Sequence, residues 1–400
     1  MLYREMPSNG DELSLLGFGC MRLPEKDGAI DEERAMRQVR SAIDRGVNYI
    51  DTAWPYHAGQ SEPFVGRALA DGYREKVNLA TKLPAWMVHS REEMDVFLNA
   101  QLEKLNTNRI DYYLVHCLVG ELWDRVVELG IIDFLDKAKA DGRIVNAGFS
   151  FHGASEDFTR IVDAYPWQFC QIQYNYLDEE NQAGTKGLEY AAGKGLGVIV
   201  MEPLRGGKLG GPAPAAVAAI WDEAETKRTP AEWALRWLWN HPEVTVVLSG
   251  MNEEAHIEEN LKVAGEAYPH SLTDAELQLV QRAEREYRHL MKAGCTGCRY
   301  CMPCPAGVNI PVCLEIYNDL HLYEKVDEAK SMYVIRLCGT LVSGEPAYAS
   351  QCIRCGQCLE KCPQHLEIPS LLESAARELE GPDLKDRETI IKKALGGASD

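Results

Sequence analysis

Ten of the thirteen cysteines in this 400-residue chain lie between residues 295 and 362. Eight of them form two blocks, CTGCRYCMPCP (295–305) and CIRCGQCLEKCP (352–363). The second block has the spacing C-x2-C-x2-C-x3-C-P, and the first is one residue shorter before its fourth cysteine. This spacing is typical of thiolates that hold 4Fe–4S clusters. Zinc is the alternative, but two C-x2-C pairs would suffice for it, which leaves the third cysteine and the Cys-Pro of each block unexplained.

The two blocks predict two clusters that share their ligands. In two-cluster proteins the fourth cysteine of each run serves the other cluster. We therefore assign Cys295, Cys298, Cys301 and Cys362 to one cluster, and Cys352, Cys355, Cys358 and Cys304 to the other. Cys313 and Cys338 fit no ligand spacing, and we expect both to be buried as small apolar side chains. The helical pattern between the blocks predicts a mainly α-helical ferredoxin-like domain.

Eight short apolar runs precede the cysteines. We expect them to form the elements that position any other functional side chains. They span residues 15–20, 47–52, 77–82, 111–116, 144–150, 169–174, 197–202 and 244–250. Nearly continuous apolar runs are typical of strands that are covered on both faces. Amphipathic helical patterns lie between them, as in DEERAMRQVRSAIDRG (31–46). This alternation predicts an α/β fold, a (β/α)8 barrel.

A doubly wound sheet is the alternative architecture, but the G-x-G-x-x-G turn that it would bring for a dinucleotide is missing after the first run. We expect the barrel to span residues 1–285, the ferredoxin-like domain residues 286–376, and a polar tail residues 377–400.

Four polar residues fall at or just after the ends of successive predicted strands. They are Asp51, Tyr56, Lys82 and His116. In a (β/α)8 barrel these ends form the mouth where chemistry takes place. A lysine cation beside a phenol is expected to lower the pKa of the phenol, and an aspartate would hold that cation in place. Tyr56 would then donate a proton to a carbonyl oxygen that His116 orients.

These residues lie in motifs that resemble the aldo-keto reductase superfamily. The motifs are DTAWPYHAGQSEPFVGRAL (51–69), LATKLP (79–84) and DYYLVH (111–116). The resemblance covers roughly residues 1–270 and extends to the subgroup with a C-terminal ferredoxin-like domain. It implies that an NAD(P)H-dependent oxidoreductase reduces an aldehyde or ketone without metal at the carbonyl, with Asp51, Tyr56, Lys82 and His116 as its catalytic residues.

The resemblance also implies where a nicotinamide cofactor would bind. The matching positions are Ser150, Gln171, Met201, Ser249, Glu259 and Asn260. The basic residues that take the 2′-phosphate of NADP in the family correspond to Gly250 and His256 here. Arg205 and Lys208 follow the seventh strand, where barrels of this fold usually bind phosphate, and are candidates to supply the missing charge.

The composition of the chain limits the kinds of partner that we expect. The net charge of −19 argues against nucleic acid. No apolar run reaches the roughly 18 residues that cross a bilayer, so we expect no membrane partner. The first residues lack the basic and apolar regions of a secretory signal, so we expect a cytoplasmic protein.

Three functions remain open. In the first, the clusters relay electrons between a ferredoxin or flavodoxin-type carrier and a carbonyl substrate. Because a nicotinamide moves hydride and a cluster moves one electron, a flavin is then a candidate intermediary. In the second, an NAD(P)H-dependent carbonyl reductase uses its clusters only for structure or for docking a partner. In the third, the chain is a non-enzymatic electron-transfer or redox-sensing protein.

Overall fold

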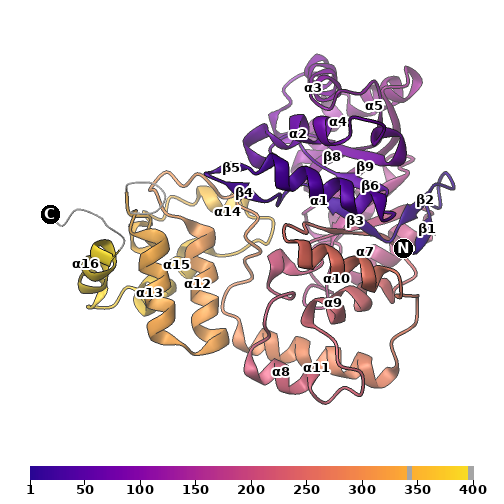
Figure 1. Ribbon diagram of the computed structural model, residues 1–400. Coiled ribbons are helices and arrows are strands. Elements are labelled where there is room, and N and C mark those ends of the chain that lie inside the picture. Colours follow the sequence, from indigo (N-terminus) through magenta and orange to yellow (C-terminus); the bar gives the residue numbers. More distant parts are fainter. Residues whose placement is uncertain (340–344, 395–400) are drawn as a thin grey trace. The chain divides into compact units, whose positions relative to one another are not determined.

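The computed structural model describes residues 1–339 and 345–394 (Figure 1). The chain divides into two compact units. The first comprises Met1–Gly211 and Arg228–Leu277, and the second comprises Pro212–Lys227 and Gln278–Asp400. The domain boundaries predicted from the sequence, at residues 285 and 376, remain predictions. The second compact unit also takes in a segment from the middle of the chain.

The first unit contains a closed barrel of eight parallel strands, as the apolar runs predicted. In spatial order the strands are β3 (Leu16–Gly19), β6 (Tyr49–Asp51), β7 (Asn78–Leu83), β8 (Ile110–Leu118), β9 (Ile144–Phe151), β10 (Phe169–Gln173), β11 (Gly197–Met201) and β12 (Val244–Ser249). β12 pairs with β3, so no strand of the barrel is left with an open edge. All eight predicted strands are confirmed.

Helices follow each strand and cover the outside of the barrel. They are α1 (Glu32–Asp44), α2 (Ser61–Ala68), α3 (Arg91–Lys104), α4 (Gly120–Glu128), α5 (Ile131–Ala140), α6 (Ser155–Asp163), α7 (Gly184–Gly193), α9 (Pro230–Trp239) and α10 (Glu254–Ala264). Side-chain caps begin several of them. Thr229, for example, accepts a hydrogen bond from the backbone of Glu232 at 3.0 Å, and Pro230 occupies the first helical position.

The barrel interior is filled by side chains and is not a pore. The packed residues are Met6, Leu13, Tyr49, Ala80, Tyr112, Leu114, Phe169, Ile199, Val246 and Leu248. Met6 and Leu13 come from the N-terminal hairpin of β1 (Tyr3–Glu5) and β2 (Glu12–Ser14). Gly148 leaves room for the Phe169 ring, because a Cβ at residue 148 would lie 2.5 Å from that ring. This filling leaves the strand ends as the place for a site.

The second unit is helical, which confirms the predicted character of the C-terminal region. Its helices are α8 (Ala215–Trp221), most of α11 (Asp274–Leu290), α12 (Ile310–Tyr323), α13 (Val326–Leu337), α14 (Gln357–Lys361), α15 (Ile368–Leu379) and α16 (Leu384–Ala394). Cys313 and Cys338 are buried in its core, as expected. Part of the predicted polar tail is α16, where Arg387 pairs with Asp327 on α13 at 2.6 Å.

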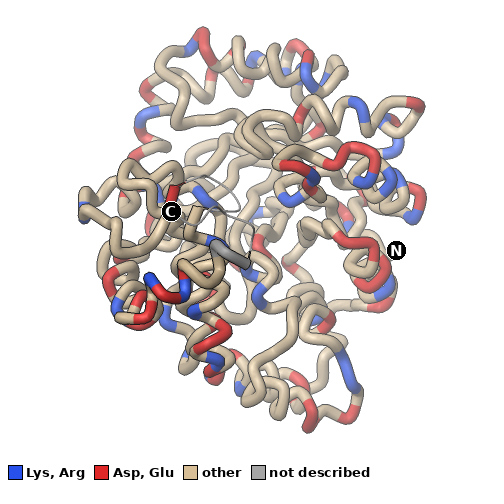
Figure 2. The backbone as a smooth tube through the Cα atoms, turned by 60° about the vertical axis from the view of Figure 1, so that its left-hand side comes forward, with Lys and Arg blue, Asp and Glu red and all other residues tan. Residues whose placement is uncertain are grey.

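Charged residues are interspersed in sign along the chain, and many of them lie on the helices and loops around the barrel (Figure 2). The excess of acidic residues is therefore spread and does not form a single block. In the part of the chain that the structure describes, no helix is both long and apolar enough to cross a membrane.

Candidate active site and cluster-binding loops

The structure brings the four predicted polar residues together at the strand ends. Asp51 is the last residue of β6, Lys82 and His116 lie near the ends of β7 and β8, and Tyr56 begins a short 3-10 turn, η1 (Tyr56–Gly59). Lys82 Nζ lies 2.7 Å from each carboxylate oxygen of Asp51, 2.8 Å from the carbonyl oxygen of Thr52 and 3.4 Å from Tyr56 Oη. The ammonium therefore directs its three donors at the carboxylate, the backbone and the phenol.

Burial is the largest cause of the pKa shifts of Tyr56, Lys82 and Asp51. It raises the pKa of Tyr56 well above its ordinary value, and the charge of Asp51 adds to that. The expected net lowering of the Tyr56 pKa is therefore not found, because burial is the largest cause of the shift and it acts in the opposite direction. Burial also lowers the pKa of Lys82 and raises that of Asp51, each opposed by the charge of the other. The phenol consequently keeps its proton at neutral pH.

His116 completes the site as a neutral imidazole. Its ring lies 6.2 Å from the Tyr56 ring, centroid to centroid, and 5.1 Å from that of Trp86, a partly exposed residue. Burial holds the pKa of His116 well below its ordinary value, and the charges of Lys82 and His152 act in the same direction. A neutral imidazole can donate one hydrogen bond to a substrate oxygen without adding charge.

The low pKa of His116 predicts acid sensitivity of the barrel. Below the unfolded-state pKa of about 6.5, the unfolded chain binds a proton that the folded chain excludes. The free energy of unfolding should therefore fall by about 1.4 kcal/mol per pH unit from this group as pH drops below that value. Urea denaturation followed by tryptophan fluorescence at several pH values measures it. His116→Gln should flatten the dependence by this amount, and equal pH slopes in both proteins would contradict the assignment.

A buried polar layer behind the site was not predicted from the sequence. Glu62 is fully buried and accepts hydrogen bonds from Thr81 at 2.7 Å and from Gln101 at 2.6 Å. Gln101 also donates to the backbone oxygen of Lys82 at 3.0 Å. These contacts fix the end of β7 and with it the direction of the Lys82 side chain. The residues that make these hydrogen bonds are far apart in the sequence, so no local sequence pattern predicts the contacts.

The residues predicted to hold the nicotinamide lie on neighbouring strands. Ser150 pairs in register with Gln171, whose Nε2 lies 3.5 Å from Met201 Sδ. Ser150 Oγ accepts a hydrogen bond from the backbone of Cys117 at 2.8 Å. Gln171 Oε1 is buried and has no hydrogen-bond partner among the described residues. A buried acceptor of this kind fits an amide donor such as the carboxamide of a nicotinamide.

Of Ser249, Glu259 and Asn260, which were predicted to bind the nicotinamide cofactor, one pair is brought together. Asn260 donates to Ser249 Oγ at 3.0 Å. Glu259 instead accepts from Thr229 at the start of α9. Arg205 is buried, and its Nε donates to Asp178 at 3.0 Å, so part of its guanidinium is engaged within the protein.

Lys208 and Arg22 are two further basic residues near the positions predicted to bind the cofactor. Lys208 lies half-buried just after Arg205. Arg22 was missed, because only the fold reveals it: a Cβ built on Gly250 would lie 3.1 Å from Arg22 Cβ. The aliphatic part of the Arg22 side chain therefore lies beside Gly250, the position that the family resemblance matches to a basic residue.

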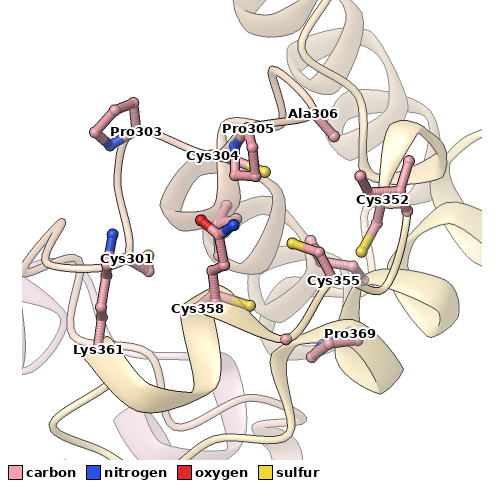
Figure 3. A pocket seen from close by; sticks show the side chains of 15 residues that line it. Cys301, Pro303, Cys304, Pro305, Ala306, Cys352, Cys355, Cys358, Lys361 and Pro369 are labelled. Carbon is pink, nitrogen blue, oxygen red and sulfur yellow. The ribbon is translucent and has the colours of Figure 1, made fainter.

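The eight block cysteines surround two pockets in the second unit. The cysteines that line one pocket are Cys295, Cys298, Cys301 and Cys362. The cysteines that line the other are Cys301, Cys304, Cys352, Cys355 and Cys358. Figure 3 shows the sulfurs of this second set around a common space. Apart from Cys301, which lines both pockets, the two lining sets match the two ligand sets predicted from the sequence.

Burial and neighbouring thiols raise the pKa of cysteines in both sets. Burial raises the pKa of Cys301 to about 12, and the thiols of Cys295, Cys362 and Cys358 add to the shift. Burial also raises the pKa of Cys358, and the thiols that add to it are Cys352, Cys355 and Cys304. Metal binding would displace these protons, because the thiolate is the ligand.

The backbone bends in the same way in both blocks. Gly297 and Arg299 flank Cys298 with φ values of 71° and 68°. Arg354 and Gly356 flank Cys355 with φ values of 55° and 78°. Left-handed residues near right-handed ones can turn successive N–H groups toward one point and form concavities that suit anionic groups, including iron–sulfur clusters. The repeated bend is consistent with two similar anionic clusters.

Helices of the second unit anchor the chain just before each block. Asn318 on α12 is buried, accepts hydrogen bonds from the backbone of Lys292 and Ala293, and donates to the oxygen of Ala293 at 2.7 Å. Tyr333 on α13 is buried and accepts from the backbone of Ala349 at 2.8 Å. The sequence pattern did not single out either anchor, because each is a single polar residue in a helix.

A closed eight-stranded barrel with a buried Asp, Lys, Tyr and His at its strand ends defines an oxidoreductase of the aldo-keto reductase type. The chain belongs to the aldo/keto reductase family, whose sequence profile matches residues 15–284. A 4Fe-4S dicluster domain matches residues 294–366, which supports iron–sulfur as the metal chemistry of the cysteine blocks.

Individual relatives agree with the family assignment. An L-galactose dehydrogenase from Arabidopsis thaliana is 27% identical over 284 residues, covering 66% of this chain and 88% of the plant protein. The holo form of the aldo-keto reductase AKR11C1 from Bacillus halodurans is 26% identical with a TM-score of 0.59, covering 71% of this chain and 96% of that one. An aldo/keto reductase from Klebsiella pneumoniae, solved with NADP and acetate, shares the fold at 22% identity and a TM-score of 0.59, covering 70% and 95%.

Proposed function

We propose that this oxidoreductase reduces, or in reverse oxidises, a small carbonyl-type substrate with a nicotinamide in the barrel mouth. The eight block cysteines would hold two 4Fe–4S clusters, which would supply one-electron transfer to or from an external carrier of the ferredoxin or flavodoxin type. The observation that carries the proposal is the buried Lys82 ammonium, which contacts both Asp51 and the phenol of Tyr56. Such a group supplies a proton where negative charge develops on a carbonyl oxygen.

Each side chain has one role in this reaction. A reduced nicotinamide, when bound, supplies the hydride. Tyr56 donates its proton to the carbonyl oxygen, and Lys82 stabilises the phenolate that remains. Asp51 keeps the ammonium in place through both of its oxygens. His116 donates a hydrogen bond to the same substrate oxygen and orients it.

The electron count sets a further requirement. A nicotinamide moves two electrons as hydride, whereas each cluster moves one. Electron exchange between a nicotinamide and a cluster therefore needs an intermediate carrier that can transfer both one and two electrons, either a flavin or a radical form of the substrate. Arg22 beside Gly250 offers positive charge for a 2′-phosphate, so NADP is the nicotinamide that we favour.

Anaerobic mixing of the purified protein with NADPH or NADH tests the proposal. The assay includes a panel of aldehydes, ketones and enones, with L-galactose added because of the plant relative. We expect carbonyl turnover together with bleaching of the broad visible absorption of the clusters. Turnover without bleaching would favour clusters that serve structure or docking. No turnover with any nicotinamide would overturn the proposed reaction.

A further inference from the structure

The turn that presents Tyr56 has an unusual backbone. His57 and Ala58 have φ values of 50° and 52°, and Gly59 follows at 87°. Three successive left-handed residues are rare, and two of these carry a Cβ that disfavours the conformation. Such a backbone persists only where the surrounding structure holds it. The contacts that hold this turn therefore bear directly on where the phenol lies.

The His57 side chain supplies two of those contacts. It is 6% exposed, and its Nε2 accepts a hydrogen bond from the backbone of Leu23 at 3.1 Å. Because Nε2 accepts, the ring proton lies on Nδ1, which is 3.0 Å from a carboxylate oxygen of Glu25. Leu23 and Glu25 belong to the segment that leads into the hairpin of β4 (Glu25–Lys26) and β5 (Ala29–Ile30). His57 thus ties the Tyr56 turn to this hairpin.

The His57 contacts act together with backbone hydrogen bonds in the same turn, such as the one that Gln60 donates to the oxygen of His57 at 3.0 Å. The backbone of Tyr56 donates to Ala53 at 3.2 Å, and its hydroxyl lies 3.4 Å from Lys82 Nζ, which is long for a hydrogen bond. A tilt of the turn at residue 57 would carry the hydroxyl, at the far end of the side chain, away from Lys82. Proton transfer is sensitive to displacements of this size, since about 1 Å of misplacement can cost about a hundredfold in rate.

We propose that His57 is a positioning residue, which holds the phenol of Tyr56 against Lys82 by joining the strained turn to the β4–β5 hairpin. This role rests on the proposed carbonyl reduction, because it assigns His57 to the proton donor of that reaction. It also gives the hairpin a part in catalysis, although the hairpin supplies no group that touches substrate.

Three replacements of His57 separate the side-chain contacts from the backbone strain. His57→Ala removes both contacts and keeps the strain, and we expect kcat to fall about 10- to 100-fold with KM little changed. His57→Gly relieves the strain and still removes the contacts, so it should lose kcat to a similar degree. His57→Gln can accept from Leu23 and donate to Glu25, and it should recover most of the loss. His89→Ala is the control, because His89 also faces a glutamate but lies exposed.

Amide hydrogen exchange supplies a readout that does not depend on activity. In His57→Ala and His57→Gly, exchange should quicken in residues 23–30 and 56–60 and stay unchanged elsewhere. Full kcat in His57→Gly would overturn the inference, as would exchange identical to that of the parent protein. If the parent shows no carbonyl turnover but the exchange pattern appears, the proposed reaction fails while the tie to the hairpin stands.

Discussion

Tyr56→Phe should lower kcat for carbonyl reduction by about 10²- to 10⁴-fold, the usual contribution of a general acid. The change removes one oxygen and leaves the ring in its buried place. In the part of the chain that the structure describes, the Tyr56 hydroxyl is an acidic proton that Lys82 contacts directly. Because burial raises the pKa of Tyr56, the parent enzyme should keep this proton well into alkaline pH. KM should change little, since the phenol acts mainly as negative charge develops.

Tyr190→Phe is the matched control for this variant. Tyr190 on α7 donates a hydrogen bond from its hydroxyl to Asp163 on α6 at 2.7 Å, and it takes no part in the site. Steady-state kinetics with the best substrate of the panel measures both variants, and the visible spectrum shows whether the clusters are retained. Full activity in Tyr56→Phe would remove the assigned acid and leave the barrel chemistry unexplained.

Pairs of cysteine variants should show which thiols share a cluster. Each cluster takes about four irons, so the parent protein should hold about eight per chain. Cys362→Ala alone should lower this to about four. Adding Cys298→Ala should cost nothing more, because both residues line the same pocket. Adding Cys355→Ala to Cys362→Ala should remove nearly all the iron, because Cys355 lines the other pocket.

A block-wise arrangement predicts the reverse pattern, with about four irons retained in the pair of Cys355 and Cys362 and nearly none in the pair of Cys298 and Cys362. Iron analysis after anaerobic purification decides between the two. Cys313→Ala is the control, since Cys313 is buried in the helical core and lines neither pocket. It should retain about eight irons.

Much of the fold and the placement of the site could be predicted from the sequence, because the signals are local. A covered parallel strand is a short apolar run, and eight of these runs alternate with helical patterns. Asp51, Lys82 and His116 each end one run, so a barrel must bring them to one mouth. The cysteine spacing is likewise a local property, and it is sufficient to propose which thiols group together.

Other features depend on contacts between distant parts of the chain. The pKa of Tyr56 is set by how deeply the finished barrel buries the phenol, which no motif encodes. Arg22 reaches Gly250 only because β12 closes against β3. Asn318 and Tyr333 look like ordinary helical residues in the sequence. Only the folded structure shows that they accept hydrogen bonds from the segments before the cysteine blocks. Composition also gave no reason to expect α16 in the polar tail.

The division of the chain bears on where it can be truncated. The second unit includes residues 212–227, where Val217 and Trp221 of α8 are buried and Glu223 pairs with Arg282 at 2.5 Å. Arg282 lies within the stretch that matches the aldo/keto reductase family, before the 4Fe-4S domain. Removal of everything after residue 277 would therefore take this partner from residues 212–227 and expose apolar side chains of α8, so truncation at that point should yield an aggregation-prone fragment.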